Sequence, residues 1–361
     1  MSLRPNRTIQ KVLISTTSKL VGLYDQKSLL ITHAWPDFYS RHSFARAVES
    51  PISRSAYIFA FETDHIEKKE GELHPNYSVM GDLICSYLSI FYGKRFDNHG
   101  LVEGIGQFHI PNLAQFSAFC DPNLPQNSHS PRVDFNVHLN LVEFARIQPL
   151  LIDGGLDLKF IRTLQSAGKF YLKALQNAED DPEIAYLHLV TAGEILANSM
   201  SIDKDLLLDE RIKTVLKKIK DSMDEGNKIA NELKNRMWQI KRRFVETILE
   251  FVDDEFFTHT EAHEQFMGLA SETFRETIAA AYDLRSRYVH TGVPFGQWIS
   301  LNPAGMNNEV QIGRPVVNDK DLAKIIEKAP TLIGLERVIR YCLMRLIQHN
   351  IACSNENIST L

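Results

Sequence analysis

The chain has 361 residues, of which 44% are hydrophobic and 24% are charged, and its formal net charge is −5. This composition is typical of a soluble globular protein and is long enough for two domains, each with its own core. It excludes a polycation that binds nucleic acid over its whole surface, so any such contact has to come from a local basic patch.

The four cysteines, Cys85, Cys120, Cys342 and Cys353, are far apart and form no Cys-x-x-Cys pair, so neither a zinc ribbon nor a redox motif is indicated. Their small number fits a reducing cytosol. Met1–Lys11 holds no apolar stretch of signal-peptide length, and no window approaches the roughly 18 apolar residues of a membrane span. We therefore expect a cytoplasmic protein without a membrane-spanning segment.

Residues 1–152 mix strand-like and helical patterns. β-branched residues dominate Thr8–Thr17, and short apolar runs follow at Lys27–Ile31 and Tyr57–Phe61, which predicts strands. Apolar residues recur at steps of three and four within 78–93, which predicts a helix. The first half is therefore predicted to be an α+β module with a regulatory or recognition role. The pattern does not determine the topology of this module.

From residue 153 to residue 361 the pattern is helical. Acidic residues and Pro182 stand where the start of a helix favours them. Phe266 and Leu269 belong to the apolar stripe expected late in the chain. The predicted helices cover 158–175, about 180–199, 203–222, 225–257, 261–290 and 331–349. We therefore expect an all-α bundle in the second half, formed without support from a sheet.

The helix predicted over 261–290 closes with Leu284–Gly292, which reads Leu-Arg-Ser-Arg-Tyr-Val-His-Thr-Gly. Arg285 is a permanent cation that can hold a phosphate with a planar fork of donors. His290 can take or give a proton near neutral pH. Together they form a minimal set for cleaving RNA without a metal, with the arginine on the scissile phosphate and the histidine on the ribose 2′-hydroxyl.

An Arg-x4-His pair late in a helical domain resembles the Arg-x4–6-His motif of the HEPN superfamily. The residues around Arg285 and His290, and the upstream segment Leu187–Leu196 with its embedded Glu194, look most like the Apea-like HEPN branch. The resemblance covers roughly residues 155–352. It implies a HEPN-like bundle that is a metal-independent endoribonuclease or binds RNA, works as a homodimer with two motifs lining one cleft, and serves antiviral defence or a toxin system.

The spacing of the two motif residues bears on oligomeric state. On an ideal helix Arg285 and His290 are about 140° apart around the axis, so they cannot lie side by side on one straight helix. They converge only if the helix tightens or ends there, or if a two-fold partner brings a second copy of each. The prediction of a homodimer thus has a geometric reason besides the resemblance.

Both motif residues also have an ordinary structural interpretation. Arg285 can pair with Asp283 or Glu276 on the surface, and His290 can cap the end of its helix. Glu194 lies close to the apolar face of its helix, where a carboxylate is costly unless it is paired. An ion pair with Arg285 would orient the arginine, and the alternative is a partner on the helix of Glu194 itself or on the surface.

Two neighbours are further candidates for the site. Arg287 lies on nearly the same helix face as His290, so it is either a second phosphate contact or a solvated arginine. Tyr288 either donates a hydrogen bond in the cleft or belongs to the core.

The segment 211–243 holds eleven Lys or Arg residues against four acidic ones, whereas 244–264 holds seven acidic residues and no Lys or Arg. The basic segment is a candidate for tracking an RNA backbone, or it forms salt bridges with the acidic segment. The candidate RNA-binding residues are Lys217, Lys218, Lys220, Lys241, Arg242 and Arg243.

No metal or cofactor is expected. His259 and His263 are four apart, but the glutamates around them do not form His-Glu-x-x-His, and no phosphate-binding glycine loop is present. The leading interpretation is a HEPN-type endoribonuclease. The alternatives are a non-catalytic dimerisation module that binds RNA or a protein partner, and a sensor whose N-terminal domain binds an unknown trigger through Trp35, Tyr57 and Phe59.

Overall fold

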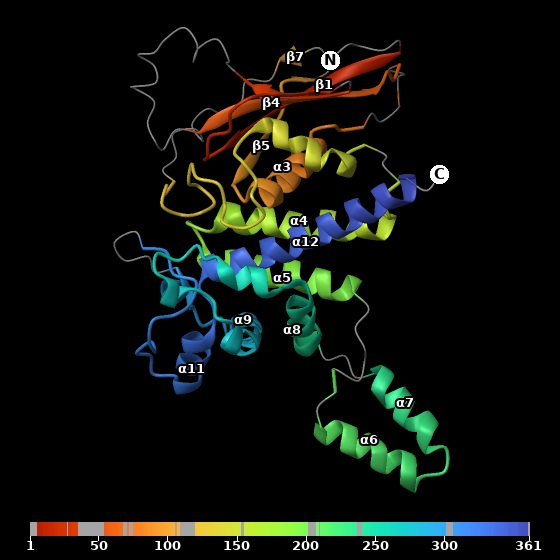
Figure 1. The fold of residues 1–361 in the computed structure, drawn as a ribbon, viewed down its shortest axis with the longest axis vertical. Helices are drawn as coiled ribbons and strands as arrows, with labels where there is room; N and C mark the ends of the chain where they lie inside the picture. Colours follow the sequence, from red (N-terminus) through yellow and green to blue (C-terminus); the bar gives the residue numbers. More distant parts are fainter. Residues whose placement is uncertain are drawn as a thin grey trace.

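The structure is a computed structural model that describes residues 6–26, 28–34, 54–67, 71, 75–104, 107–108, 120–152, 155–200, 207–208, 210–236, 240–300 and 306–359. An antiparallel sheet forms one end of the molecule, layers of helices form the middle, and a helical hairpin extends at the other end (Figure 1). Within the described ranges, no helix is both long enough and apolar enough to cross a membrane.

The N-terminal sheet has five strands in the order β2-β3-β4-β1-β5, and all neighbours are antiparallel. β1 and β4 pair along their whole length of ten residues. Val12 and Ile14 of β1 are fully buried, as expected for β-branched residues on the covered face of a sheet. The strands are β1 (Arg7–Thr16), β2 (Tyr24–Gln26), β3 (Leu29–His33), β4 (Ser55–Asp64) and β5 (Phe96–Leu101), with a separate pair β6 (Glu103–Gly104) and β7 (Gln107–Phe108).

Helix α3 (Val79–Tyr92) covers one face of this sheet (Figure 1). It ends at Gly93, whose φ of 64° lies in the left-handed region that favours glycine. The space around Gly93 is also filled, because a Cβ there would lie 2.5 Å from Cγ of Arg132. Arg340 of the last helix donates to the carbonyl of Phe91 at 2.7 Å and so satisfies the end of α3.

The second half is a helical bundle around α12, as predicted. α4 and α5 form a hairpin, and α12 packs against α3, α4, α5 and α8 (Figure 1). The side chains of Asp157 and Asp181 cap α4 and α5 by accepting backbone N–H bonds. The main helices are α4 (Leu158–Asn177), α5 (Pro182–Ser199), α8 (Ile240–Phe251), α9 (Ser271–Thr291), α11 (Lys320–Lys328) and α12 (Leu332–Ser359).

The sheet and the bundle share one hydrophobic core. Val12 of β1, Leu88 of α3, Leu172 of α4 and Leu343 of α12 belong to one continuous cluster of buried side chains. The predicted boundary between residues 152 and 153 therefore marks a change in secondary structure and not a gap between two cores.

A buried ionic network fastens the two halves together. Arg132, in the loop after the sheet, donates to Glu336 of α12 at 2.6 and 3.0 Å and to Glu261 at 2.6 Å. The hydroxyl of Tyr171 on α4 also donates to Glu336. The Arg132 side chain is only 2% exposed, so its charge depends on these carboxylates.

A second buried arginine extends this network. Arg337 of α12 donates to Asp134 at 2.9 and 3.0 Å, to Glu309 at 3.1 and 3.2 Å, and to the carbonyl of Phe256 at 2.7 Å. The carboxylate of Glu309 also accepts the backbone N–H of Leu269 at 2.9 Å. Segments far apart in the sequence are thereby held against α12.

The prediction of one long helix over 225–257 is wrong. The chain forms α7 (Gly226–Arg236) and then α8, which ends at Phe251. α7 pairs with α6 (Glu210–Ser222), and the two share a small core of their own around Leu208, Leu216 and Ala230. Two residues after the end of α8, the carboxylate of Asp253 accepts a hydrogen bond from the hydroxyl of Tyr341 at 2.6 Å. This contact takes the place of a further helical turn.

The prediction of a helix from Glu261 is wrong for its first ten residues, because α9 begins at Ser271. The preceding segment pairs with 307–310 through backbone hydrogen bonds, and only Gln265–Met267 within it forms a 3-10 turn, so it does not continue α9 backwards. Phe266, expected in the apolar stripe, is 72% exposed, whereas Leu269 is buried as expected. After α9 the chain adds a short helix α10 (Gly296–Ile299) and α11, neither of which was predicted.

Candidate active site

The motif arginine forms an ion pair with Glu194, which was one of the two interpretations that the sequence left open. The buried stripe of α9, which includes Ile278, Ala281 and Leu284, packs the helix against α5 and α8. This packing places Nη2 of Arg285 2.9 Å from Oε2 of Glu194 on α5. The side chains are 24% and 15% exposed, so the pair lies at the edge of the core, in contact with solvent.

The alternative partners of Arg285 are bound to other cations. Asp283 accepts from Lys241 of α8 at 2.6 Å. Glu276 accepts from Lys328 of α11 at 2.7 Å. The surface pairings considered for Arg285 are therefore wrong.

The local packing explains how Glu194 reaches the arginine. The preceding residue is Gly193, where a Cβ would lie 2.5 Å from the ring of Phe244 on α8, so α5 passes very close to α8.

Tyr282 also lies beside the motif arginine. The guanidinium carbon of Arg285 lies 5.8 Å from the centre of the Tyr282 ring. Burial and the nearby carboxylate of Glu194 raise the pKa of Tyr282. Tyr282 belongs to this site although the sequence interpretation left it out; its spacing of three residues from Arg285 on one helix was the available signal.

Only part of the donor capacity of Arg285 is used by the protein. Nη2 donates to Glu194, while Nε is buried and has no hydrogen-bond partner among the residues described. A guanidinium carries five N–H donors in a plane. The arrangement thus fixes the arginine in place and leaves donors over for an anion.

His290 lies in the last turn of α9 and is exposed. Its imidazole makes no hydrogen bond or ion pair with any residue in the described ranges. α9 remains regular through Thr291 and ends at Gly292, whose φ is 67° and whose N–H donates to the carbonyl of Tyr288 at 2.8 Å. The helix therefore neither tightens nor stops before His290, and Arg285 and His290 of one chain stay about 140° apart around the axis.

Arg287 and Tyr288 are used in packing α9 against its neighbours. Arg287 pairs with Asp319, the N-cap residue of α11, so it is neither a free phosphate contact nor a solvated arginine. The ring of Tyr288 meets that of Phe295 edge-on, with centres 5.4 Å apart. For Tyr288 the interpretation as a packing residue fits this contact.

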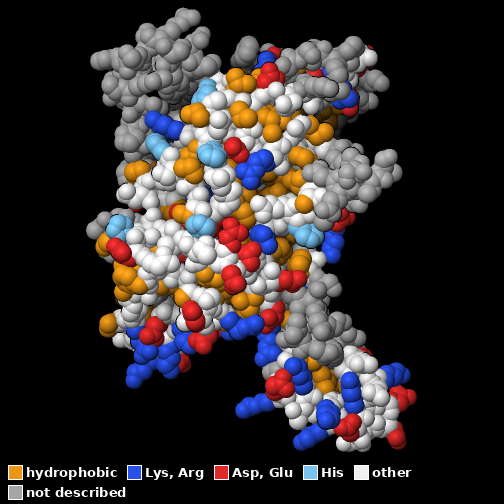
Figure 2. Space-filling model, viewed as in Figure 1, with side chains coloured by type: hydrophobic (Ala, Val, Ile, Leu, Met, Phe, Trp, Pro, Cys, Tyr) orange, Lys and Arg blue, Asp and Glu red, His pale blue; other side chains and the backbone are white. Residues whose placement is uncertain are grey.

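The six candidate RNA-binding residues divide into two groups. Lys217, Lys218 and Lys220 are exposed on α6, in the hairpin that projects from the bundle (Figures 1 and 2). On α8, Lys241 binds Asp283, and Arg242 and Arg243 donate to backbone carbonyls, at 3.1 Å for Leu207 and 2.8 Å for Ala197. The contacts of the second group hold α8 against α9, the end of α5 and Leu207.

Two of the three N-terminal residues proposed to sense a ligand are buried in the core. Tyr57 and Phe59 are 1% and 0% exposed in the core behind the sheet. The hydroxyl of Tyr57 binds the backbone of Leu20. Trp35 lies outside the described residues. No group of three or more potential metal ligands occurs within the described ranges, and His259 and His263 belong to no such group.

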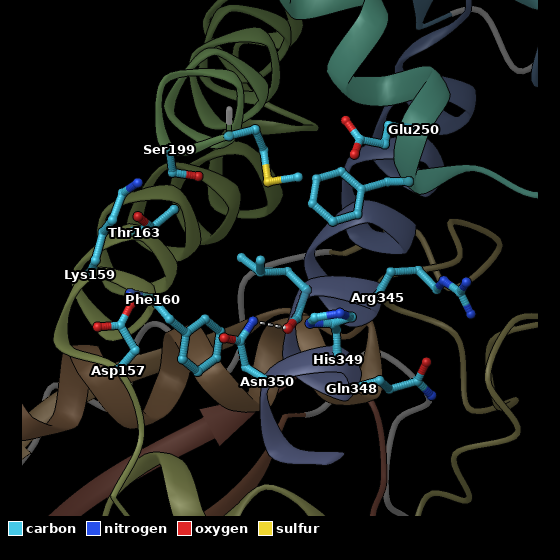
Figure 3. Close-up of a pocket in the computed structure, with 13 residues that line it drawn as sticks. Asp157, Lys159, Phe160, Thr163, Ser199, Glu250, Arg345, Gln348, His349 and Asn350 are labelled. Carbon is cyan, nitrogen blue, oxygen red and sulfur yellow. Dashed lines mark hydrogen bonds between the residues drawn. The ribbon is translucent and has the colours of Figure 1, made fainter. Parts of the chain in front are cut away.

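A large hollow of about 650 Å³ lies away from the motif (Figure 3). It opens between the start of α4, the ends of α5 and α8, and residues 345–350 of α12. Apolar side chains such as Phe160, Phe251 and Leu346 line it, and Lys159 and Arg345 stand among its polar residues. Neither Arg285 nor His290 lines this hollow, so the motif lies outside it.

No family model, no curated protein and no solved structure matches this chain. The case for a function therefore rests on the resemblance of the motif, on the geometry of the described residues and on general chemistry.

Proposed function

We propose that the protein is a metal-independent endoribonuclease of HEPN type. The observation that carries the proposal is the partly exposed Arg285, fixed by Glu194 at 2.9 Å, on the same helix as an exposed and unbonded His290. A fixed guanidinium with unused donors is suited to charge that develops on a phosphate. An exposed imidazole with no bond to the described residues is free to take a proton from a substrate hydroxyl.

In the proposed reaction His290 takes the proton of a ribose 2′-hydroxyl, and the 2′-oxygen attacks the neighbouring phosphorus. The bond from phosphorus to the 5′-oxygen breaks, and that oxygen takes a proton from water. Arg285 donates to the non-bridging oxygens as their charge rises. The products are a 2′,3′-cyclic phosphate and a 5′-hydroxyl, and the requirement for a 2′-hydroxyl makes RNA the substrate.

The proposed active site is formed by two copies of the chain. Within one copy the regular helix keeps Arg285 and His290 apart, so each site takes the arginine from one copy and the histidine from the other. Val289, one turn beyond Arg285 on the same helix face, is 54% exposed, and Val293 is 39% exposed. These apolar side chains beside the motif support an isologous contact there.

Lys217, Lys218 and Lys220 on the α6–α7 hairpin extend the proposed RNA-binding surface. Their exposed ammonium groups would bind backbone phosphates outside the site of cleavage. A role in antiviral defence or as a toxin belongs to the same proposal and rests on the resemblance of the motif.

The test is cleavage of a labelled single-stranded RNA in excess EDTA. We expect the wild type to cut it, to leave 2′,3′-cyclic phosphate ends and to spare DNA of the same sequence. Arg285→Ala and His290→Ala should each lose the activity. The matched control is Arg275→Ala, since Arg275 lies on the same helix in an exposed ion pair with Glu246. Cleavage that requires a divalent metal, or that survives both motif substitutions, rejects the proposal.

The competing function is a non-catalytic dimerisation module that binds RNA or a protein partner. The Arg285–Glu194 pair is also consistent with it, because an ion pair between two helices can serve packing alone. It predicts no cleavage by the wild type, and RNA binding that survives Arg285→Ala and His290→Ala.

A further inference from the structure

A second cavity, of about 510 Å³, lies where the loop after the sheet meets the helical bundle. Its walls come from the loop 121–126, the end of α4, the middle of α5, the end of α10 and the start of α12. We call it the junction pocket. Its lining residues include Asp121, Ala178, Glu179, Asp180, Ile299 and Asn308.

The lining combines an apolar floor with negative charge. Leu175, Leu189 and Leu332 contribute the apolar surface. Four carboxylates line the pocket, and no Lys or Arg is among its described lining residues. Glu336 is neutralised by Arg132 behind it, at 2.6 Å. The other three, Asp121, Glu179 and Asp180, have no ion-pair partner within the described ranges. Glu179 accepts hydrogen bonds from the N–H of Asp121 and the side chain of Asn127, and Asp121 accepts one from the N–H of Asn123, so their negative charge is not neutralised by a cation.

One lining atom is an acceptor without a donor. Oδ1 of Asn308 is buried and has no hydrogen-bond partner among the residues that the structure describes. A buried acceptor left unbonded costs free energy, and such atoms are uncommon in folded proteins. A bound molecule with an N–H group would satisfy it.

We propose that the junction pocket binds a small apolar molecule that carries an ammonium group. The apolar body fits the leucine-lined floor, and the ammonium group answers both the unpaired carboxylates and the free acceptor of Asn308. The hollow in Figure 3 is lined by two cations, Lys159 and Arg345, as well as by the carboxylates of Asp157 and Glu250. Its mixed charge therefore does not favour a positively charged ligand.

An occupant of the junction pocket would touch the element that supports the motif helix. Ile299 at the end of α10 lines the pocket. Phe295, just before α10, packs edge-on against Tyr288 of α9 and Tyr186 of α5, with ring centres 5.4 and 5.5 Å apart. α10 is also tied to α5, since the N–H of Gly296 donates to Glu183 at 2.8 Å. The pocket is therefore linked to the last turn of α9 through α10, with Ile299 at the pocket and Phe295 against Tyr288.

The proposal is tested with three probes of one shape and different charge: phenethylamine, 2-phenylethanol and 3-phenylpropionate. Calorimetry on the full chain at neutral pH should show phenethylamine binding at least about tenfold more tightly than either of the others. Asn308→Leu and Asp180→Asn should each weaken it by about threefold to tenfold, and Ala178→Leu should abolish it by filling the cavity. Glu250→Gln, a carboxylate change in the other hollow, is the matched control and should have no effect.

Hydrogen exchange on the same samples locates the site and its reach. Phenethylamine should slow exchange in 295–300 and 288–292 and leave the α6–α7 hairpin unchanged. Circular dichroism shows whether each variant is folded. If Ala178→Leu does not fold, the Asn308→Leu variant still tests whether the pocket binds the amine. Absence of phenethylamine binding, equal binding of amine and carboxylate, or binding unaffected by the folded Asn308→Leu variant would overturn the proposal.

Discussion

Glu194 accepts a hydrogen bond from Nη2 of Arg285 across 2.9 Å, and this contact joins α5 to α9 at the edge of the core. A long, flexible arginine is thereby held in one position before any substrate arrives. Holding a group in its working geometry is what raises its effect on a transition state. The carboxylate of Glu194 thus has a role in the proposed chemistry although it touches no reacting atom.

Glu194→Gln should lower kcat/KM for RNA cleavage by about tenfold to a hundredfold, because a charged hydrogen bond to the arginine becomes a neutral one. The protein should remain folded, since glutamine has nearly the same shape. Glu246→Gln, which weakens the neighbouring Arg275–Glu246 pair between α8 and α9, is the control and should retain full activity. Equal losses in the two variants would assign Glu194 to packing alone.

His290→Ala should lower the cleavage rate by about 10²- to 10⁴-fold, the range for loss of a general base or acid. Its free energy of unfolding should stay within about 0.5 kcal/mol of the wild type, because the imidazole is exposed and unbonded within the described ranges. Single-turnover kinetics and urea denaturation measure the two quantities. A large loss of stability, or full activity, would contradict the assignment.

Replacing Lys217, Lys218 and Lys220 by glutamine should weaken RNA binding without changing the rate at saturating RNA. If all three contact phosphates, the slope of log affinity against log salt should become shallower by about two. The control is the triple glutamine variant at Lys159, Lys169 and Lys173, exposed lysines on α4. Unchanged salt dependence in the α6 variant would show that the hairpin does not contact RNA.

Arg132→Ala should destabilise the protein by about 3–5 kcal/mol, because it leaves the buried carboxylates of Glu261 and Glu336 without their shared cation. Arg275→Ala removes an exposed ion pair and should cost less than about 1 kcal/mol. Urea denaturation of the two variants compares these values. Equal costs would mean that the buried network does not fasten the sheet to the bundle.

Stability should fall in acid through Glu261. Burial raises the pKa of this carboxyl, but Arg132, Lys94 and the N–H of Val133 favour the charged form more strongly, so its pKa lies below the ordinary value of 4.5. A lowered folded-state pKa gives stability that is complete above the unfolded value and is lost as pH falls through the folded one. Urea midpoints measured from about pH 5 down to pH 3 should decrease, and Glu261→Gln should show a shallower decrease. An identical pH slope in both proteins would exclude Glu261 as a source.

The sequence predicted most of what depends on local pattern. β1 and β4 were readable from β-branched and apolar runs, and α5 from Pro182 and the acidic residues at its start. The cost of a carboxylate near an apolar face indicated that Glu194 needs a partner, but it left open whether that partner is Arg285 or a residue on its own helix or on the surface. The structure shows that it is Arg285.

Features that depend on distant contacts could not be predicted. The start of α9 is set by Glu309, whose carboxylate binds the N–H groups of Glu261 and Leu269 about forty residues earlier. The structural roles of Lys241 and Arg243 are set by Asp283 and the end of α5. No periodicity within either segment indicates these partners, and the junction pocket is likewise assembled from six separate parts of the chain.

The shared active site is tested most directly by mixing two inactive variants, Arg285→Ala and His290→Ala, and allowing the subunits to exchange. A mixed dimer retains one site with both wild-type residues, so an equal mixture should regain about one quarter of the wild-type RNA cleavage in EDTA. Each variant alone should stay inactive. If the wild type cuts RNA and the exchanged mixture does not, Arg285 and His290 do not act across two copies.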